Sequence, residues 1–366
     1  MSASRPQLVV VIGAGPAGLA ASHELKRRGI EHRVLERGAS VGTSWRGLYD
    51  SLVLHTGRHL SHLPGMRFPR GTPLFPPRDA LVSYLERYAG GLPVETRCAV
   101  HRVTRVNQTW RVLSSRGEIR AGAIVVATGI ISNPRVPRLP GSEEFGGPIR
   151  HSVEYLRAEA CERRRILIVG TGNSANEIAT ELAAHGARVS VAVRSGANVV
   201  PREILGIPIQ YLAALVRRLP APVRRSVVGA VGAVTEWRNG PSPFPRPPYG
   251  PLDSIPMIGT GLVRAIREGR IALRGGIERL TGRGARFADG TEEEFDEILL
   301  ATGFDPAIEI LGGLVRLDER RFARRRDRVV SLDQPNLYFI GHNYDSAGAL
   351  WNIRRDAPLI AERLSR

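Results

Sequence analysis

The chain of 366 residues, 42% of them hydrophobic, is long enough to form two or three domains with cores of their own. Its net charge of +17 is carried almost entirely by arginine, because Lys26 is the only lysine. These arginines are spread along the chain and do not gather in one basic stretch, so we expect no nucleic-acid partner.

The cysteines and the apolar runs indicate the compartment. Cys98 and Cys161 are the only cysteines and do not form a CxxC pair, which argues for a reducing environment and against a dithiol redox centre. The first strand-like run begins at Leu8, so we expect no signal peptide. No run of about eighteen apolar residues occurs. We therefore predict a cytoplasmic protein without a membrane span.

Residues 8–36 carry the clearest motif of the chain. The apolar run 8–12 predicts a strand buried on both faces, and it leads into a GxGxxG sequence and a helical segment that ends near Arg28. Gly13 suits a tight turn, Gly15 the approach of a pyrophosphate, and Gly18 close packing of helix on strand. A second strand, 31–35, ends at Glu36, whose carboxylate suits the hydroxyls of a ribose. We interpret this stretch as a dinucleotide-binding unit.

The next segment predicts a loop beside the cofactor. Its small and hydroxyl residues lead to an aromatic ring that could cover a ligand: Gly42, Thr43, Ser44 and Trp45. Trp45 as a core aromatic and His55 as a polar residue at a strand end are the alternative interpretation. Further on, the pattern predicts a helix over 78–89 and a strand meander over 94–106 and 110–113. A buried strand over 124–129 ends in small residues that let backbone approach a ligand.

A second glycine fingerprint begins after the predicted strand 165–169. Gly170 and Gly172 open a helix, and a further strand spans 188–193. Glu36 lies 23 residues after Gly13, and Arg194 lies 24 residues after Gly170. A cation in this place suits the 2′-phosphate of NADPH, and the alternative is a surface arginine. Two such units in one chain predict one bound flavin and one nicotinamide.

The remainder predicts less regular structure and then a return to the first domain. Helices are expected over 211–219 and 223–237, where arginines stand among apolar residues, and 241–256 is rich in proline. Such helices suit a pocket cap or a subunit contact, hence a homodimer, better than a membrane surface. A helix over 262–267, a strand over 271–273 and a turn at 288–291 follow. The strands 298–303 and 336–341 and a helix from Gly348 complete the chain.

These elements predict an α/β fold with two Rossmann-like dinucleotide-binding domains, one for FAD and one for NADPH, the second inserted in the first. The FAD-binding domain is expected over 1–157 plus 295–366. The NADPH-binding domain is expected over 158–294, with a helical and proline-rich insertion at about 196–260. No metal site is expected.

The chain resembles the flavin-containing monooxygenases, most closely the YUCCA-type branch and its bacterial relatives. The sequence 145–155 matches their FxGxxxHxxxY signature at Phe145, Gly147, His151 and Tyr155. Baeyer–Villiger enzymes typically have Trp at the last of these positions. The resemblance extends from Leu8 to about Arg363.

The resemblance implies which residues contact the two cofactors. Those for FAD are Gly13, Gly15, Pro16, Ala17, Gly18, Glu36, Arg37, Gly42, Thr43, Ser44, Trp45 and His55, with backbone at Val100 and Ala127. Those for NADPH are Gly170, Gly172, Asn173, Ser174 and Arg194. His151 and Tyr155 would belong to a linker that couples nicotinamide movement to catalysis. Because the chemistry is carried by the flavin, no side chain is assigned as a catalytic acid or base.

The activity implied by the resemblance is an NADPH-dependent monooxygenase that forms a C4a-(hydro)peroxyflavin. It would insert one atom of O2 into a small organic substrate, by N- or S-oxygenation or by oxidative decarboxylation of a 2-oxo acid. Three alternatives remain: a Baeyer–Villiger monooxygenase, an NADPH oxidase, and a non-catalytic redox-sensing flavoprotein.

Overall fold

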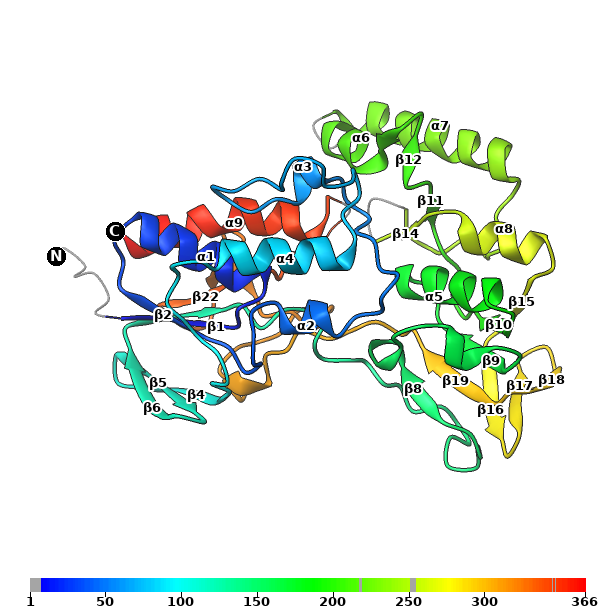
Figure 1. Ribbon diagram of the computed structural model, residues 1–366, viewed down its shortest axis with the longest axis horizontal. Helices are drawn as coiled ribbons and strands as arrows, with labels where there is room; N and C mark the ends of the chain where they lie inside the picture. Colours follow the sequence, from blue (N-terminus) through cyan, green and yellow to red (C-terminus); the bar gives the residue numbers. More distant parts are fainter. Residues whose placement is uncertain (1–7, 217–218, 251–254, 344, 346) are drawn as a thin grey trace. The chain divides into compact units, whose positions relative to one another are not determined.

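The computed structural model describes residues 8–216, 219–250, 255–343, 345 and 347–366, which form two units (Figure 1). The first unit comprises Met1–Gly47, Thr56–Asn133 and Phe304–Arg366, and the second comprises Leu48–His55 and Pro134–Gly303. The second unit therefore interrupts the first twice along the sequence. Because the relative placement of the units is not determined, each is described by itself.

The first unit is built on a seven-stranded sheet in the order β20-β21-β22-β7-β1-β2-β3. The strands β22, β7, β1, β2 and β3 are parallel, and β20 and β21 add an antiparallel edge. Their bounds are β1 Val9–Ile12, β2 His32–Leu35, β3 Val94–Glu95, β7 Ala123–Val126, β20 Arg325–Arg326, β21 Val330–Ser331 and β22 Leu337–Phe339. The predicted run 8–12 is β1, whose four side chains are all buried.

The two faces of this sheet are covered differently (Figure 1). Val10 and Ile12 pack with Trp110 on the small antiparallel sheet β4-β5-β6. Because strand side chains alternate, Val9 and Val11 point to the opposite face, where α1 and α9 pack on each other. The further elements are α1 Pro16–Arg27, α2 Thr43–Arg46, α3 Arg58–Ser61, α4 Arg78–Tyr88, β4 Val100–Val106, β5 Thr109–Ser114, β6 Gly117–Ala121 and α9 Ala349–Leu364.

The second unit repeats this plan with a five-stranded parallel sheet in the order β15-β10-β9-β19-β8. Ile166 and Ile168 pack toward α5 and α8, whereas Leu167 packs toward the antiparallel sheet β16-β17-β18. The bounds are β8 Ile149–His151, β9 Arg165–Val169, α5 Asn173–Ala184, β10 Arg188–Ala192, α8 Gly261–Arg267, β15 Ile271–Arg274, β16 Ile277–Thr281, β17 Gly284–Phe287, β18 Glu292–Glu294 and β19 Glu297–Leu300.

The region 196–260 belongs to the second unit and contains the expected helices together with short strand pairs. Parallel β11 and β14 pair with each other, as do antiparallel β12 and β13. The helix α7 is largely exposed, and the Trp237 side chain is 82% exposed. The bounds are β11 Val199–Val200, β12 Glu203–Ile204, β13 Ile207–Pro208, α6 Ile209–Val216, α7 Ala221–Asn239 and β14 Met257–Ile258. None of the helices that the structure describes is long and apolar enough for a membrane crossing.

The units divide at different residues from the predicted domains. Residues 134–157 group with the second unit because β8 pairs with β19, and His151 is held at the end of that strand. Residues 48–55 also group with the second unit, and no local pattern indicated this. Pairing between strands about 150 residues apart cannot be recognised from the amphipathic period of either strand alone.

Candidate functional site

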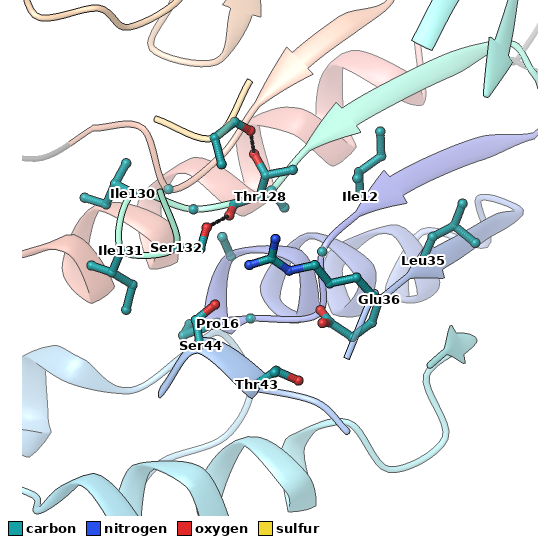
Figure 2. A pocket seen from close by; sticks show the side chains of 18 of the residues that line it. Ile12, Pro16, Leu35, Glu36, Thr43, Ser44, Thr128, Ile130, Ile131 and Ser132 are labelled. Atoms are coloured by element: carbon teal, nitrogen blue, oxygen red, sulfur yellow. Dashed lines mark hydrogen bonds between the residues drawn. The ribbon is translucent and has the colours of Figure 1, made fainter. Parts of the chain in front are cut away.

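A pocket of about 300 Å³ lies in the first unit, at the carboxyl ends of β1, β2 and β7 (Figure 2). This is the edge of a parallel sheet at which nucleotides bind. The lining comes from segments that are far apart in the sequence: Ile12, Gly13, Gly15, Pro16, Ala17, Leu35, Glu36, Arg37, Thr43, Ser44, Trp45, Cys98, Ala99, Val100, Ala127, Thr128, Gly129, Ile130, Ile131, Ser132, Ala307, Glu309, Ile310, Gly341, Ala349, Leu350 and Ile353.

The glycines of the first fingerprint have three different surroundings. Gly13 has a φ of +104°, and a Cβ there would lie 2.6 Å from the Ala127 carbonyl oxygen. A Cβ at Gly18 would lie 1.8 Å from the Gly13 carbonyl oxygen, so helix and turn can approach this closely only without a side chain. At Gly15, by contrast, a Cβ would meet no atom within 4 Å. Gly13 and Gly18 are therefore required by the protein's own packing, whereas Gly15 leaves space in the pocket.

The Glu36 carboxylate is fixed at the end of β2. The Ala14 amide donates to its Oε2 and the Gly38 amide to its Oε1, both at 2.7 Å. A carboxylate oxygen that accepts one hydrogen bond retains a further lone pair. The buried Glu36 side chain can thus accept hydroxyl donors such as those of a ribose, and Figure 2 shows it among the pocket residues.

Most residues predicted for FAD meet at this pocket, and three do not line it. Gly18 lies behind the turn, and Gly42 caps α2 with a φ of +66° while its amide donates to the Ala14 carbonyl oxygen. His55 belongs to the second unit. Sequence reasoning did not single out the segment 130–132 or the segment 307–310 as lining, although it predicted that the strand 124–129 ends in small residues that let backbone approach a ligand.

The segment Leu48–His55 packs on α5 of the second unit. The His55 Nε2 lies 2.8 Å from the Glu177 Oε1, and the Tyr49 hydroxyl donates to the other oxygen of the same carboxylate. The Ser51 hydroxyl donates to Glu181 one turn further along the helix. The structure thus places His55 beside Glu177 and not in the pocket where it was expected.

The second fingerprint has the same local geometry as the first. Gly170 has a φ of +124°, and a Cβ there would lie 2.4 Å from the Ala301 carbonyl oxygen. Gly172 caps α5 and, like Gly15, would meet nothing within 4 Å if it carried a Cβ. The Asn173 side chain accepts a hydrogen bond of 2.6 Å from the Ile258 amide, which ties β14 to the start of α5. Ser174 follows in the first turn. The N-terminus of α5 is therefore open to a phosphate.

Arg194 lies two residues after the end of β10. Strand β10 is the parallel neighbour of β9, the strand that leads into the start of α5. The Arg194 side chain is exposed, and within the described part of the chain it makes no hydrogen bond or ion pair. An unpaired guanidinium at the carboxyl end of a parallel strand is available to a phosphate.

The signature residues at 145–155 belong to the second unit, where Phe145, His151 and Tyr155 are buried. Phe145 packs in the core with Leu167 and Phe287. The His151 Nδ1 accepts from the Val153 amide, so its Nε2 donates to the Gly303 carbonyl oxygen at 3.0 Å. Burial lowers the pKa of His151 and raises that of Tyr155. Both side chains are therefore uncharged at neutral pH. Gly147 is required because a Cβ would lie 2.8 Å from the Asp296 carbonyl oxygen.

His342 follows the pocket residue Gly341, and its side chain is buried. Its ring packs on Phe322 and Phe339, and within the described residues neither ring nitrogen has a hydrogen-bond partner. Burial, with a smaller contribution from the nearby Arg325 cation, lowers the pKa of His342 to about 3. The His342 ring is therefore neutral at pH 7, and it packs on two aromatic rings.

This burial predicts a loss of stability in mild acid. The unfolded chain binds a proton at the ordinary histidine pKa of about 6.5, whereas the folded chain does so only near pH 3. Protonation thus favours unfolding, and the contribution of His342 falls by about 1 kcal/mol for each pH unit below 6.5. His342→Phe should remove this part of the pH dependence, as measured by urea unfolding at pH 7.5 and 5.5. His101→Phe, on an exposed position of β4, should leave the dependence unchanged. Equal slopes in wild type and His342→Phe would contradict this.

The described residues contain no group of three His, Cys, Asp or Glu side chains arranged to hold a metal ion. Two parallel sheets, each with a glycine turn and an open helix start, define a class: oxidoreductases that bind two dinucleotides. Residues 10–204 match the family described as pyridine nucleotide-disulphide oxidoreductase.

Named relatives narrow this class. Indole-3-pyruvate monooxygenase YUCCA1 of Oryza sativa subsp. japonica is 37% identical over 308 residues, which cover 81% of this chain and 76% of that protein. Indole-3-pyruvate monooxygenase YUCCA4 of the same plant is 34% identical over 322 residues, covering 81% and 73%. The structure of a flavin-containing monooxygenase from Stenotrophomonas maltophilia has the same fold, with a TM-score of 0.78, 24% identity, and coverage of 98% and 97%.

The chain belongs to the family of YUCCA-type flavin-containing monooxygenases. It is an FAD- and NADPH-dependent monooxygenase, which confirms the predicted enzyme class and both predicted cofactors.

Proposed function

We propose that FAD occupies the pocket of the first unit and that NADPH binds at the start of α5 in the second, so that the units are two Rossmann-like domains. The space at Gly15 and the fixed Glu36 carboxylate support the first assignment. The space at Gly172 and the unpaired Arg194 guanidinium support the second. Bound FAD supplies the chemistry, because it accepts hydride from NADPH and activates O2.

In this proposal the protein binds and orients the two cofactors and excludes water from the flavin. The amides at the start of α1 receive the FAD pyrophosphate, and Glu36 accepts the ribose hydroxyls. Apolar side chains from Ile131, Ile310 and Leu350 line the pocket and keep water from an isoalloxazine ring. His151 and Tyr155 hold the linker in the second unit. No side chain is asked to transfer a proton.

We further propose that the substrate is a 2-oxo acid of the indole-3-pyruvate type, which undergoes oxidative decarboxylation. The observation that carries this is the 37% identity to a relative named for that substrate. The reaction consumes the 2-oxo acid, O2, NADPH and a proton, and it releases CO2, water, NADP⁺ and the carboxylic acid that is shorter by one carbon. One oxygen atom enters the acid and the other leaves as water.

The test is to supply the purified holoenzyme with NADPH, 18O2 and indole-3-pyruvate and to analyse the product by mass spectrometry. We expect the shortened acid with one 18O atom, formed in equal amount to the NADPH consumed. An amine or a sulfide supplied in parallel distinguishes N- or S-oxygenation, and a ketone would give an ester with a Baeyer–Villiger enzyme. NADPH consumption that yields only peroxide with every substrate would contradict the proposal.

A homodimer and a cytoplasmic location belong to the same proposal, and sedimentation velocity tests the dimer.

A further inference from the structure

An ion pair between a partly exposed arginine and a fully buried aspartate ties helix α9 to the turn between β20 and β21. The Asp356 side chain on α9 is fully buried, and its Oδ1 accepts from the Arg328 Nε at 2.7 Å. The Arg328 Nη2 donates to the Asn352 Oδ1 one turn earlier on the helix, at 2.8 Å. Arg328 thus spans two turns of α9 with one planar group, a geometry that a lysine does not reproduce.

The backbone of the turn that carries Arg328 is strained. Asp327 has a φ of +47° and Arg328 a φ of +71°, the left-handed region that non-glycine residues rarely adopt. Two such residues in succession persist only where the surroundings hold them. The contacts of Arg328 with Asp356 and Asn352 are among the interactions that hold this turn.

The same network reaches the loop between β22 and α9. The Asn343 Nδ2 donates to the Asp356 Oδ2 at 2.6 Å and to the Arg328 carbonyl oxygen at 3.1 Å. The Asp345 Oδ1 accepts from the Asn352 Nδ2 at 3.0 Å and from the Ala347 amide at 2.9 Å. Two side chains of the loop are therefore fixed by the helix residues that Arg328 orders.

The helix that this network orders, and the residue that precedes the loop, form part of the pocket. Gly341 precedes the loop and lines the pocket, as do Ala349, Leu350 and Ile353 in the first turns of α9. Asn352 and Asp356 each lie three residues after a lining residue and so occupy a neighbouring stripe of the same helix. A shift of α9 or of the loop would move the pocket wall directly.

We propose that Arg328 is a positioning residue for FAD, acting through Asp356, Asn352 and Asn343 to set the part of the pocket wall that Gly341, Ala349, Leu350 and Ile353 form. This inference rests on the proposed placement of FAD in the first unit. A buried ion pair by itself is weak evidence for stability, because apolar residues of similar volume often replace one without loss. Retention of this pair is explained by the order that it imposes on the loop.

The experiment separates positioning from stability. Arg328→Met alone leaves the Asp356 charge buried and unpaired, so the decisive variant is the double substitution Arg328→Met with Asp356→Leu, which removes both charges. Arg328→Lys retains the charge but loses the second contact. The matched control is Arg363→Met, because Arg363 on α9 pairs with the neighbouring Asp327 at 2.8 Å while both side chains are about half exposed.

Three quantities are measured: thermal unfolding of the apoprotein, hydrogen exchange of the amides over 347–353 in the apoprotein, and the Kd for FAD from quenching of flavin fluorescence. We expect the double variant to unfold near the wild-type temperature. Its amides over 347–353 should exchange about tenfold faster, and its Kd for FAD should rise about tenfold. Arg328→Lys should give an exchange rate and a Kd for FAD between those of the wild type and the double variant. Arg363→Met should match the wild type in all three measurements.

The outcomes distinguish the two proposals. A double variant with wild-type exchange and wild-type affinity would show that the ion pair does not position the pocket wall and would overturn the inference. Faster exchange with unchanged affinity would also overturn the inference, because the order that the ion pair imposes on these amides would then have no effect on FAD binding. A wild-type protein that takes up no FAD would instead overturn the proposed function.

Discussion

Replacing Gly15 by alanine is expected to weaken FAD binding about 100-fold, or by about 3 kcal/mol, while the apoprotein stays folded. The added methyl group meets no protein atom within 4 Å, so it costs the empty protein little. It projects instead into the space where the proposed pyrophosphate approaches the start of α1. The measurements are the Kd for FAD, from fluorescence quenching, and the unfolding temperature of the apoprotein.

The second fingerprint supplies the matched control. Gly172→Ala places a methyl group in the equivalent position of the second unit, also with no atom within 4 Å. This variant should keep wild-type FAD affinity and weaken NADPH binding. Gly13→Ala should behave differently from both, because its Cβ would lie 2.6 Å from the Ala127 carbonyl oxygen and the apoprotein itself should be destabilised. If Gly15→Ala bound FAD normally, the pyrophosphate could not lie at this turn.

Replacing Arg194 by glutamine should raise the KM for NADPH about 30-fold and leave the KM for NADH unchanged. A hydrogen bond to a charged phosphate contributes about 2 kcal/mol, and only NADPH carries the 2′-phosphate. Because Arg194 is exposed and makes no ion pair within the described chain, its replacement should not alter the unfolding temperature. Steady-state rates of NADPH- and NADH-dependent flavin reduction provide the measurement.

The control for Arg194 is Arg188→Gln at the start of the same strand, β10. Arg188 is also exposed, but it lies at the amino end of the strand, away from the helix start at Asn173. Both KM values should stay at the wild-type level in this variant. Equal losses with NADPH and NADH in Arg194→Gln would mean that the guanidinium binds something common to both nucleotides.

The βαβ units are the part of the fold that the sequence predicted best. A buried strand, a glycine turn, a helix and a second strand are consecutive, so each leaves its own period or punctuation in the chain. The predicted strand 165–169 is β9, and the predicted helix 78–89 is α4 to within one residue. Gly13 was predictable because the turn that follows a buried strand permits few other residues, and Gly18 because the helix approaches that turn closely.

The segment 48–55 shows where this reasoning reaches its limit. Trp45 and His55 are ten residues apart and were both expected at the flavin. Trp45 lines the pocket of the first unit, whereas His55 lies in the second unit against Glu177. Hydrogen bonds between residues separated by 122 positions leave no local signal, because each partner is an ordinary polar residue in its own segment.

The amino-acid sequence by itself therefore determined the family that the chain belongs to and its two cofactors, and it predicted two dinucleotide-binding units, because these depend on motifs a few residues long. Only the tertiary structure decided which distant segments complete the pocket, that residues 48–55 join the second unit, and that Arg328 pairs with Asp356 on α9. The physical reason is that burial and ion pairing between remote residues depend on how the sheets and helices pack together, which no single segment encodes.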